Sequence, residues 1–118
     1  VICANDKGAI VSPALSKEDC KTISDVMDVE VLQKKIAGSH LSGVSVKANN
    51  TGGVIHPEAE EKDIEIIADV LSVKMEQTSI NGGVPYVTSG ILANNHCIIV
   101  GSMTSGSEIM NLTRAFLN

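Results

Sequence analysis

The stretch ANNTGGVIHP at positions 48–57 occurs in altered form twice more, as ANDKGAIVSP at 4–13 and ANNHCIIVGS at 93–102. The copies lie 44 and 45 residues apart, which marks an internal repeat. In each copy an Asn-Asp or Asn-Asn pair separates two short runs that favour β-strands. Because Asn, Asp and Gly tolerate positive φ, each copy predicts a β-hairpin with residues of positive φ in its tight turn.

A helical pattern follows each hairpin at nearly the same offset. Apolar residues recur at spacings of three and four, which predicts amphipathic helices that bury one face. The three sets are Cys20, Ile23, Val26 and Met27; Ile64, Ile67, Val70 and Leu71; and Ile109, Leu112 and Phe116. Ser16 followed by Asp19 resembles a capping box, with Asp in place of the usual Glu.

A third strand is predicted after the first two helices, at 29–33 and 73–77, from the alternation of apolar and polar residues. The repeating unit is therefore β-β-α-β. We predict one unit at 1–44, a second at 45–91 and an incomplete third at 92–118 that ends before its last strand. A unit this small cannot bury its apolar faces alone, so we expect the units to pack on one another.

Composition excludes several classes of function. The net charge is −5 and the chain holds one Tyr, one Phe and no Trp, which argues against direct nucleic-acid binding and for a basic protein partner. Apolar runs are far shorter than the roughly 20 residues that span a bilayer, so we expect no membrane segment. The three cysteines form no CxxC or metal-ligand pattern, which predicts no metal site and favours a reducing compartment. We also expect no cofactor and a cytoplasmic location.

With the repeat in place, several motifs resemble the archaeal form of the translation initiation factor 6 family, in its C-terminal half. They are the hairpin motif, Val-Glu-Val at 29–31, Ile-Ala-Gly at 36–38 and Thr-Ser-Gly-Ser-Glu at 104–108. The resemblance implies an α/β repeat (α+β) fold of the pentein type. In that fold five β-β-α-β units surround a pseudo-fivefold axis, and this chain would carry about two and a half of them.

The same resemblance implies a function in protein synthesis that needs no catalysis. Members of the family bind the large ribosomal subunit near its sarcin–ricin loop, mainly through a ribosomal protein, and sterically block joining of the small subunit. A complementary half-chain, or a second copy in a homodimer, would supply the missing part of the ring.

Two positions depart from the family pattern. Cys97 replaces the hairpin glycine, and Thr88 replaces the glycine expected before Ser89. If the turn requires positive φ, Cys97 costs roughly 1 kcal/mol of stability or forces a different turn.

Four residues are candidate contacts for a partner: Tyr86, Glu60, Glu61 and Asp63. Tyr86 lies in a Gly-rich loop, where an aromatic side chain can reach a partner, and aromatics are enriched at interfaces. The three carboxylates stand near the start of the second helix. Taken one position at a time, a solvated helix face that complements the helix dipole is the favoured explanation for them.

An alternative function is a pentein-type Cys/His hydrolase acting on guanidino substrates. Cys97 would be the nucleophile and His56 its base, with Asp63 and Glu58 holding the guanidinium group. This hypothesis requires the imidazole to lie within hydrogen-bond reach of the thiol.

Overall fold

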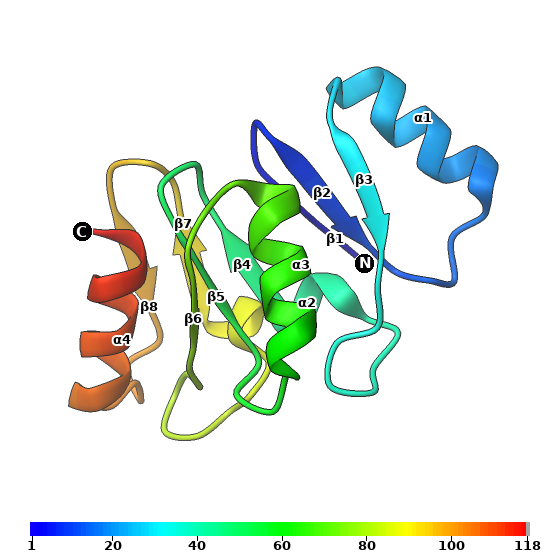
Figure 1. The fold of residues 1–118 in the computed structure, drawn as a ribbon. Coiled ribbons are helices and arrows are strands. Elements are labelled where there is room, and N and C mark those ends of the chain that lie inside the picture. Colours follow the sequence, from blue (N-terminus) through cyan, green and yellow to red (C-terminus); the bar gives the residue numbers. More distant parts are fainter. Residues whose placement is uncertain (118) are drawn as a thin grey trace.

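Three hairpins, each followed by a helix, make up most of this α+β fold (Figure 1). The computed structural model describes residues 1–117. The first set of elements is β1 (Ile2–Ala4), β2 (Gly8–Val11), α1 (Lys17–Met27) and β3 (Glu30–Gln33). The second is α2 (Ser42–Ser45), β4 (Val46–Ala48), β5 (Gly53–Ile55), α3 (Glu61–Leu71) and β6 (Met75–Gln77). The third is the 3₁₀-helix η1 (Val87–Gly90), β7 (Ile91–Ala93), β8 (Ile98–Val100) and α4 (Gly106–Phe116).

Each hairpin forms a small sheet of its own. In the first sheet β1 pairs antiparallel with β2, and β2 pairs parallel with β3. The second sheet repeats this order with β4, β5 and β6. The third contains β7 and β8, and no further strand within residues 1–117 pairs with β8. The third strands predicted at 29–33 and 73–77 are present and are slightly shorter than predicted.

A glutamine at the end of each third strand fastens the loop that precedes the helix. Gln33 Nε2 donates hydrogen bonds to the carbonyl oxygens of Ser12 and Leu15. In the second set, Gln77 Nε2 donates in the same way to Pro57 and Ala59. These bonds hold the crossover between the two parallel strands close to the edge of the sheet.

The hairpin turns are Asx turns, and the prediction that they use positive φ is wrong. Asn5 Oδ1 accepts hydrogen bonds from the backbone N–H groups of Lys7 and Gly8, at 2.9 and 3.1 Å. Asn49 and Asn94 do the same in their own turns. None of these turn residues has a positive φ in the described chain. The side-chain amide imitates a backbone turn, so no left-handed residue is needed.

Glycine is required in the first two turns because a helix passes close to them. A Cβ atom on Gly8 would lie 2.2 Å from the carbonyl oxygen of Val70 in α3. A Cβ atom on Gly52 would lie 1.7 Å from the carbonyl oxygen of Ala115 in α4. Cys97 holds the matching place in the third turn, where it is exposed and its φ is not positive. The predicted strain at Cys97 is therefore absent, because the glycines serve packing and not turn conformation.

Side-chain amides join the three turns into a ladder. Asn5 Nδ2 donates to the carbonyl oxygen of Asn49 at 3.0 Å, and Asn49 Nδ2 donates to that of Asn94 at 2.9 Å. A second set of bonds, one residue further on, links Asp6 to Asn50 and Asn50 to Asn95. Each bond satisfies a backbone or amide group between neighbouring hairpins, so the ladder fixes their mutual register.

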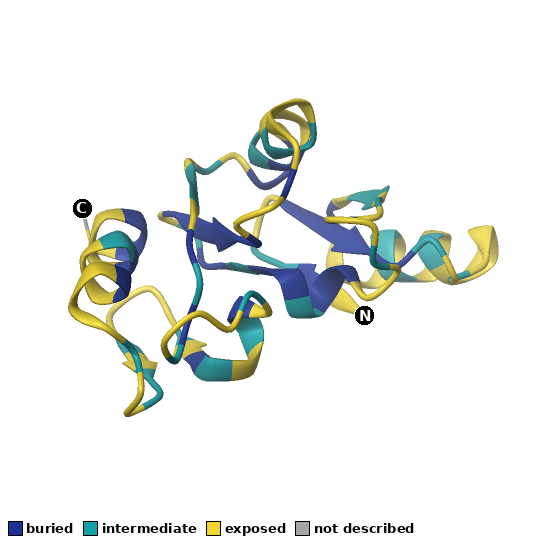
Figure 2. Cartoon of the chain, turned by 90° about the horizontal axis from the view of Figure 1, so that it is seen from below, coloured by how far each residue is buried: buried dark blue, intermediate teal, exposed yellow. Residues whose placement is uncertain are grey.

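The three long helices have equal length and differ in burial. Ser16 and Asp19 cap α1 in both directions, as predicted, and Ser105 and Glu108 form the same capping box on α4. The inner faces of α3 and α4 are buried, whereas α1 has no buried residue in the described structure (Figure 2). Helix α3 covers the hairpin of the first set, and α4 covers the hairpin of the second set. The described residues contain no earlier hairpin on which α1 could pack in the same way.

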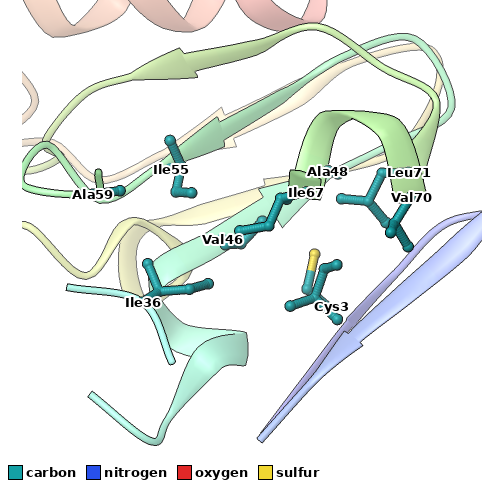
Figure 3. Close-up of a cluster of buried hydrophobic side chains, with 10 residues drawn as sticks. Cys3, Ile36, Val46, Ala48, Ile55, Ala59, Ile67, Val70 and Leu71 are labelled. Atoms are coloured by element: carbon teal, nitrogen blue, oxygen red, sulfur yellow. The ribbon is translucent and has the colours of Figure 1, made fainter. Parts of the chain in front are cut away.

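Two apolar cores lie between consecutive sets of elements. The first joins Cys3 and Ile10 of the first sheet to Ile55, Ile67 and Leu71 of the second set (Figure 3). The second core joins the outer face of the second sheet to α4 and the third hairpin, through Val54, Ile80, Val87, Ile91, Leu112 and Phe116. Each core is thus shared by two neighbours, as the predicted packing of small units requires.

Two short helices, α2 and η1, were not predicted. Both stand directly before the first strand of a hairpin, in segments with no helical periodicity. Thr88, which replaces the expected glycine, lies in η1 and donates its hydroxyl to the carbonyl oxygens of Gly43 and Val46. Its side chain makes a contact across the two segments, whereas Gly43 itself lies against the backbone of Val1 and Ile2. No helix in the part of the chain described is long and apolar enough to cross a membrane.

The close approach at Gly52 predicts a large effect of adding one methyl group. Gly52→Ala places a Cβ atom against the Ala115 carbonyl, so we expect a loss of about 2 kcal/mol or more from the free energy of unfolding, measured by urea denaturation. Gly106→Ala is the matched control, because a Cβ atom at Gly106 meets nothing within 4 Å. It should stay within about 1 kcal/mol of the wild type. Equal effects of the two substitutions would contradict this account.

Candidate partner-binding surface

A hollow of about 380 Å³ lies between the loop after β3 and the start of α3. Its lining is strongly charged and consists of Lys34, Lys35, Ala37, Gly38, Glu58, Glu60 and Asp63. The hollow therefore lies between the first and second sets of elements, and both contribute charges to it. Two of the four predicted contact residues, Glu60 and Asp63, lie here.

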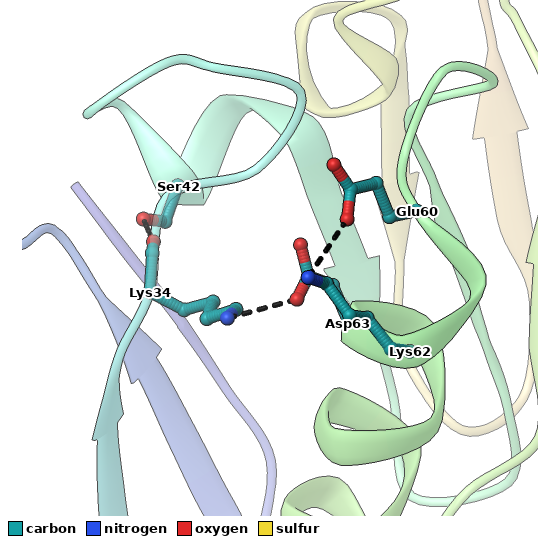
Figure 4. Close-up of polar contacts among 5 residues, drawn as sticks. All are labelled: Lys34, Ser42, Glu60, Lys62 and Asp63. Carbon is teal, nitrogen blue, oxygen red and sulfur yellow. Dashed lines mark hydrogen bonds and ion pairs between the residues drawn. The ribbon is translucent and has the colours of Figure 1, made fainter.

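Asp63 points inward and holds the two sets together. Its carboxylate forms an ion pair of 2.8 Å with Lys34 Nζ, and the Asp63 side chain is only 13% exposed (Figure 4). The backbone of Lys34 is fixed in turn, because the Ser42 hydroxyl donates to its carbonyl oxygen. Removing either partner would leave a largely buried charge without its counter-charge.

Glu60 and Glu61 are exposed but face different sides of the start of α3. Glu60 lies over the charged hollow and forms an exposed ion pair of 3.3 Å with Lys62 (Figure 4). Glu61 instead borders a second hollow between α3 and α4, which also contains Glu76 and Arg114. The structure thus does not bring the three carboxylates into one patch.

Tyr86 is 47% exposed and packs edge-on against His56, with ring centroids 5.8 Å apart. His56 is buried, and its Nδ1 accepts a hydrogen bond from the backbone N–H of Glu58. Tyr86 therefore adjoins the loop that carries Glu58 and Glu60. An exposed aromatic ring that packs on the start of a segment with two exposed carboxylates is the part of this surface best suited to a protein partner with basic side chains.

The structure does not bring Cys97 and His56 together. Cys97 lies at the turn of the third hairpin, and the amide ladder holds that turn beside the second one. His56 follows Ile55, at the end of β5 remote from the turn. The length of a three-residue strand, about 10 Å, therefore separates the two ends. Within residues 1–117 no group of three or more His, Cys, Asp or Glu side chains is arranged to hold a metal ion.

The most elaborate polar cluster surrounds Glu108, which the sequence did not single out as a site. Its carboxylate accepts hydrogen bonds from the Ser79 hydroxyl and from the backbone N–H groups of Gly82, Gly83 and Ser105. Burial raises the pKa of Glu108, but these hydrogen bonds outweigh it and lower the pKa from 4.5 to about 2. The cluster fastens the loop after β6 to the start of α4.

The family model described as the eIF-6 family matches residues 1–115. The chain belongs to the eIF-6 family. Curated relatives named "Translation initiation factor 6" include one from Nitrosopumilus maritimus, 77% identical over 118 residues, that is, 100% of this chain and 53% of the relative. The relative from Cenarchaeum symbiosum is 57% identical over 98% of this chain and 52% of its own length. The one from Pyrococcus furiosus is 55% identical over 98% of this chain and 51% of its own.

The chain therefore spans about half the length of the curated eIF-6 relatives it matches. This agrees with the sequence-based resemblance, which placed the chain in one half of the family's pattern.

Lys34 and Glu108 carry contacts that sequence reasoning missed, although a regular signal was available. Lys34 lies 29 residues before Asp63, and Ser79 lies 29 residues before Glu108. Asp63 and Glu108 both occupy the third position of a helix that packs on the preceding set. The two carboxylates are thus equivalent in the repeat, whereas Lys34 corresponds to Thr78, the residue before Ser79. The repeat register would have indicated the segment that each carboxylate contacts, but not the exact partner.

The lowered pKa of Glu108 predicts an acid-sensitive contact. The group's stabilising contribution is complete above its unfolded pKa of about 4.5 and is lost as the pH falls toward the folded value of about 2. We expect the urea midpoints of the wild type and Glu108→Gln to differ most near neutral pH and to converge as the pH falls through that window. The exposed Glu65→Gln serves as the control and should follow the wild type throughout. A gap between the wild type and Glu108→Gln that stays constant with pH would refute the assignment.

Proposed function

We propose that this chain is part of a translation initiation factor that binds the large ribosomal subunit and sterically prevents the small subunit from joining. The observation that carries the proposal is the family match over residues 1–115, together with the printed name of the relatives. Steric action requires a rigid body and a binding surface. It requires no bound cofactor and no catalytic group, which fits the separation of Cys97 from His56.

We further propose that the described residues form part of a larger pentein-type ring. Ile10 and Val54 hold matching places in the first two sheets and are fully buried by the following set of elements. Ile99 holds the same place in the third sheet and is 63% exposed. At the other end, Val26 of α1 is 80% exposed, whereas its counterparts Val70 and Ala115 are buried. Both ends of the array thus present faces that its interior covers.

The ladder of side-chain amide hydrogen bonds likewise stops at the third hairpin. Asn94 matches Asn5 and Asn49, but among residues 1–117 no acceptor lies opposite its Nδ2. A pentein ring holds five hairpins, whereas two copies of this chain would bring six, since each copy carries three. The proposed partner that completes the ring is therefore a complementary segment carrying two hairpins, in preference to a second copy.

The proposed contact surface for the ribosome consists of Tyr86 together with Glu58 and Glu60, which line the charged hollow. These residues are exposed, carry an aromatic ring and negative charge, and belong to a chain with a net charge of −5. A basic ribosomal protein is the partner that such a surface favours. Glu61 would extend the contact toward α4. We assign Asp63 to holding Lys34 and not to the partner.

Co-sedimentation with purified large ribosomal subunits tests the proposal. We expect the protein to pellet with large subunits, to reduce their joining with small subunits, and to lose affinity about tenfold or more in the double variant Tyr86→Ala/Glu60→Lys. Glu65→Lys, which makes the same charge change on an exposed site of α3, is the matched control and should bind normally.

The variant Cys97→Ser should also bind as the wild type does, because the proposed action uses no nucleophile. A folded protein that fails to pellet with large subunits would contradict the function. Normal binding by the double variant would instead contradict only the assigned surface.

A further inference from the structure

The loop between β6 and η1 contains Asn81-Gly82, the one place in the sequence where glycine follows asparagine. This dipeptide carries a general chemical liability. The backbone nitrogen of the glycine can attack the side-chain amide carbon of the asparagine, because glycine has no side chain to hinder the approach. Six other asparagines precede bulkier residues: Asn5, Asn49, Asn50, Asn94, Asn95 and Asn111.

The structure holds the attacking nitrogen in a specific bond. The backbone N–H of Gly82 donates to Glu108 Oε1 at 2.8 Å, and that of Gly83 donates to Glu108 Oε2 at 3.0 Å. Before attack the amide nitrogen must lose its proton, and a carboxylate at this distance opposes the negative charge that results. We call this pair of hydrogen bonds from Gly82 and Gly83 the Glu108 clamp. The Glu108 carboxylate also accepts hydrogen bonds from Ser79 and Ser105, which hold it in place.

The side chain under attack is also confined. A Cβ atom on Gly101 would lie 2.0 Å from Asn81 Oδ1, and one on Gly90 would lie 2.8 Å from Asn81 Nδ2. The amide therefore fills the space that both glycines leave empty. Asn81 itself adopts a positive φ of 51°, and Thr104 Oγ1 lies 3.4 Å from its Oδ1. Rotating the amide carbon toward Gly82 would require the contact of this loop with η1 and with the segment between β8 and α4 to open.

We propose that Asn81 is a site of spontaneous deamidation whose rate is controlled by the Glu108 clamp. In the reaction, hydroxide removes the proton of the Gly82 nitrogen, which then bonds to Asn81 Cγ. The bond from Cγ to Nδ2 breaks, ammonia leaves, and a cyclic imide remains. Water then opens the imide at either carbonyl, giving aspartate or isoaspartate at position 81. A proton from water completes the departing ammonia and regenerates the hydroxide. The net reaction therefore consumes one molecule of water, the one that opens the imide, and no oxidant.

The product cannot return to the original contact. It carries a new carboxylate on the residue directly before Gly82, whose N–H binds Glu108, and like charges in one loop contact repel. The isoaspartate form also adds a methylene to the backbone and displaces the N–H groups of Gly82 and Gly83. If the contact between Glu108 and the loop opens for long enough to allow the reaction, the contact is therefore altered irreversibly.

The corresponding loop of the first set supplies an internal comparison. There Ala37 takes the place of Asn81 with the same φ of 51°, and it is followed by Gly38. That loop carries no amide, and the helix carboxylate facing it, Asp63, is paired with Lys34. The backbone conformation thus does not demand asparagine, and Asn81→Ala is a conservative way to remove the reactive group.

The experiment measures aspartate and isoaspartate at position 81 by peptide mapping and mass spectrometry, after incubation of the protein in mildly alkaline buffer. We expect the native protein to react about tenfold or more slowly than the same chain unfolded in urea, which corresponds to an opening free energy of about 1.4 kcal/mol. The variant Glu108→Asp should react faster than the wild type while still folded. Its carboxylate is one methylene shorter and cannot reach both glycines, yet Asp19 shows that aspartate completes the same capping box.

Glu65→Gln is the matched control for a changed carboxylate and should react at the wild-type rate. Equal rates in the native and unfolded chains would overturn the proposed protection. A folded Glu108→Asp protein that reacts no faster would overturn the role of Glu108, and hydrogen exchange at the Gly82 amide, expected to be slow in the wild type, tests that role if the variant does not fold. Absence of reaction at Asn81 in urea would overturn the site itself.

Discussion

The fold depends on the contact between the last turn of a helix and the hairpin turn of the preceding set. Helix α3 makes this contact with the first hairpin, and α4 makes it with the second. Only glycine allows the carbonyl oxygens of Val70 and Ala115 to come as close as they do to Gly8 and Gly52. Once the helix lies there, its inner face covers the sheet and buries Ile10 or Val54. The same approach places successive turns within reach of the Asn5 and Asn49 amides. Packing and register therefore follow from one close approach, made twice.

Much of this local structure could be predicted from the sequence, because strands and helices follow patterns of neighbouring residues. The hairpins, the three long helices and the capping box at Ser16 all come from short-range patterns. The explanation predicted for the turn glycines, a positive φ, was wrong. A sequence does not show which backbone carbonyl lies close to a turn. The short helices α2 and η1 escaped because segments such as Ser42–Ser45 carry no periodic signal.

The candidate surface was predictable to a smaller extent. Tyr86 is exposed in its loop, as its position after a glycine pair suggested. Glu60, Glu61 and Asp63 were grouped because the three are close in sequence, but helical geometry turns Glu61 away from the hollow that Glu60 and Asp63 share. Asp63 faces Lys34, whose distance along the chain hid the pair. Which residues are available to the proposed partner depends on surfaces formed only in the folded molecule.

The loop after β6 has one residue more than the loop after β3, namely Gly83. The contact between the first and second sets therefore differs chemically from the contact between the second and third. In the first, Lys34 and Asp63 attract as opposite charges, whereas in the second, the lengthened loop offers uncharged N–H groups to Glu108. Dissolved salt screens attraction between opposite charges more than short hydrogen bonds to a buried carboxylate. Rising ionic strength therefore weakens the ion pair between the first and second sets more than the hydrogen bonds that hold Glu108. Two contacts at equivalent places in one repeat thus differ in how their strength depends on salt.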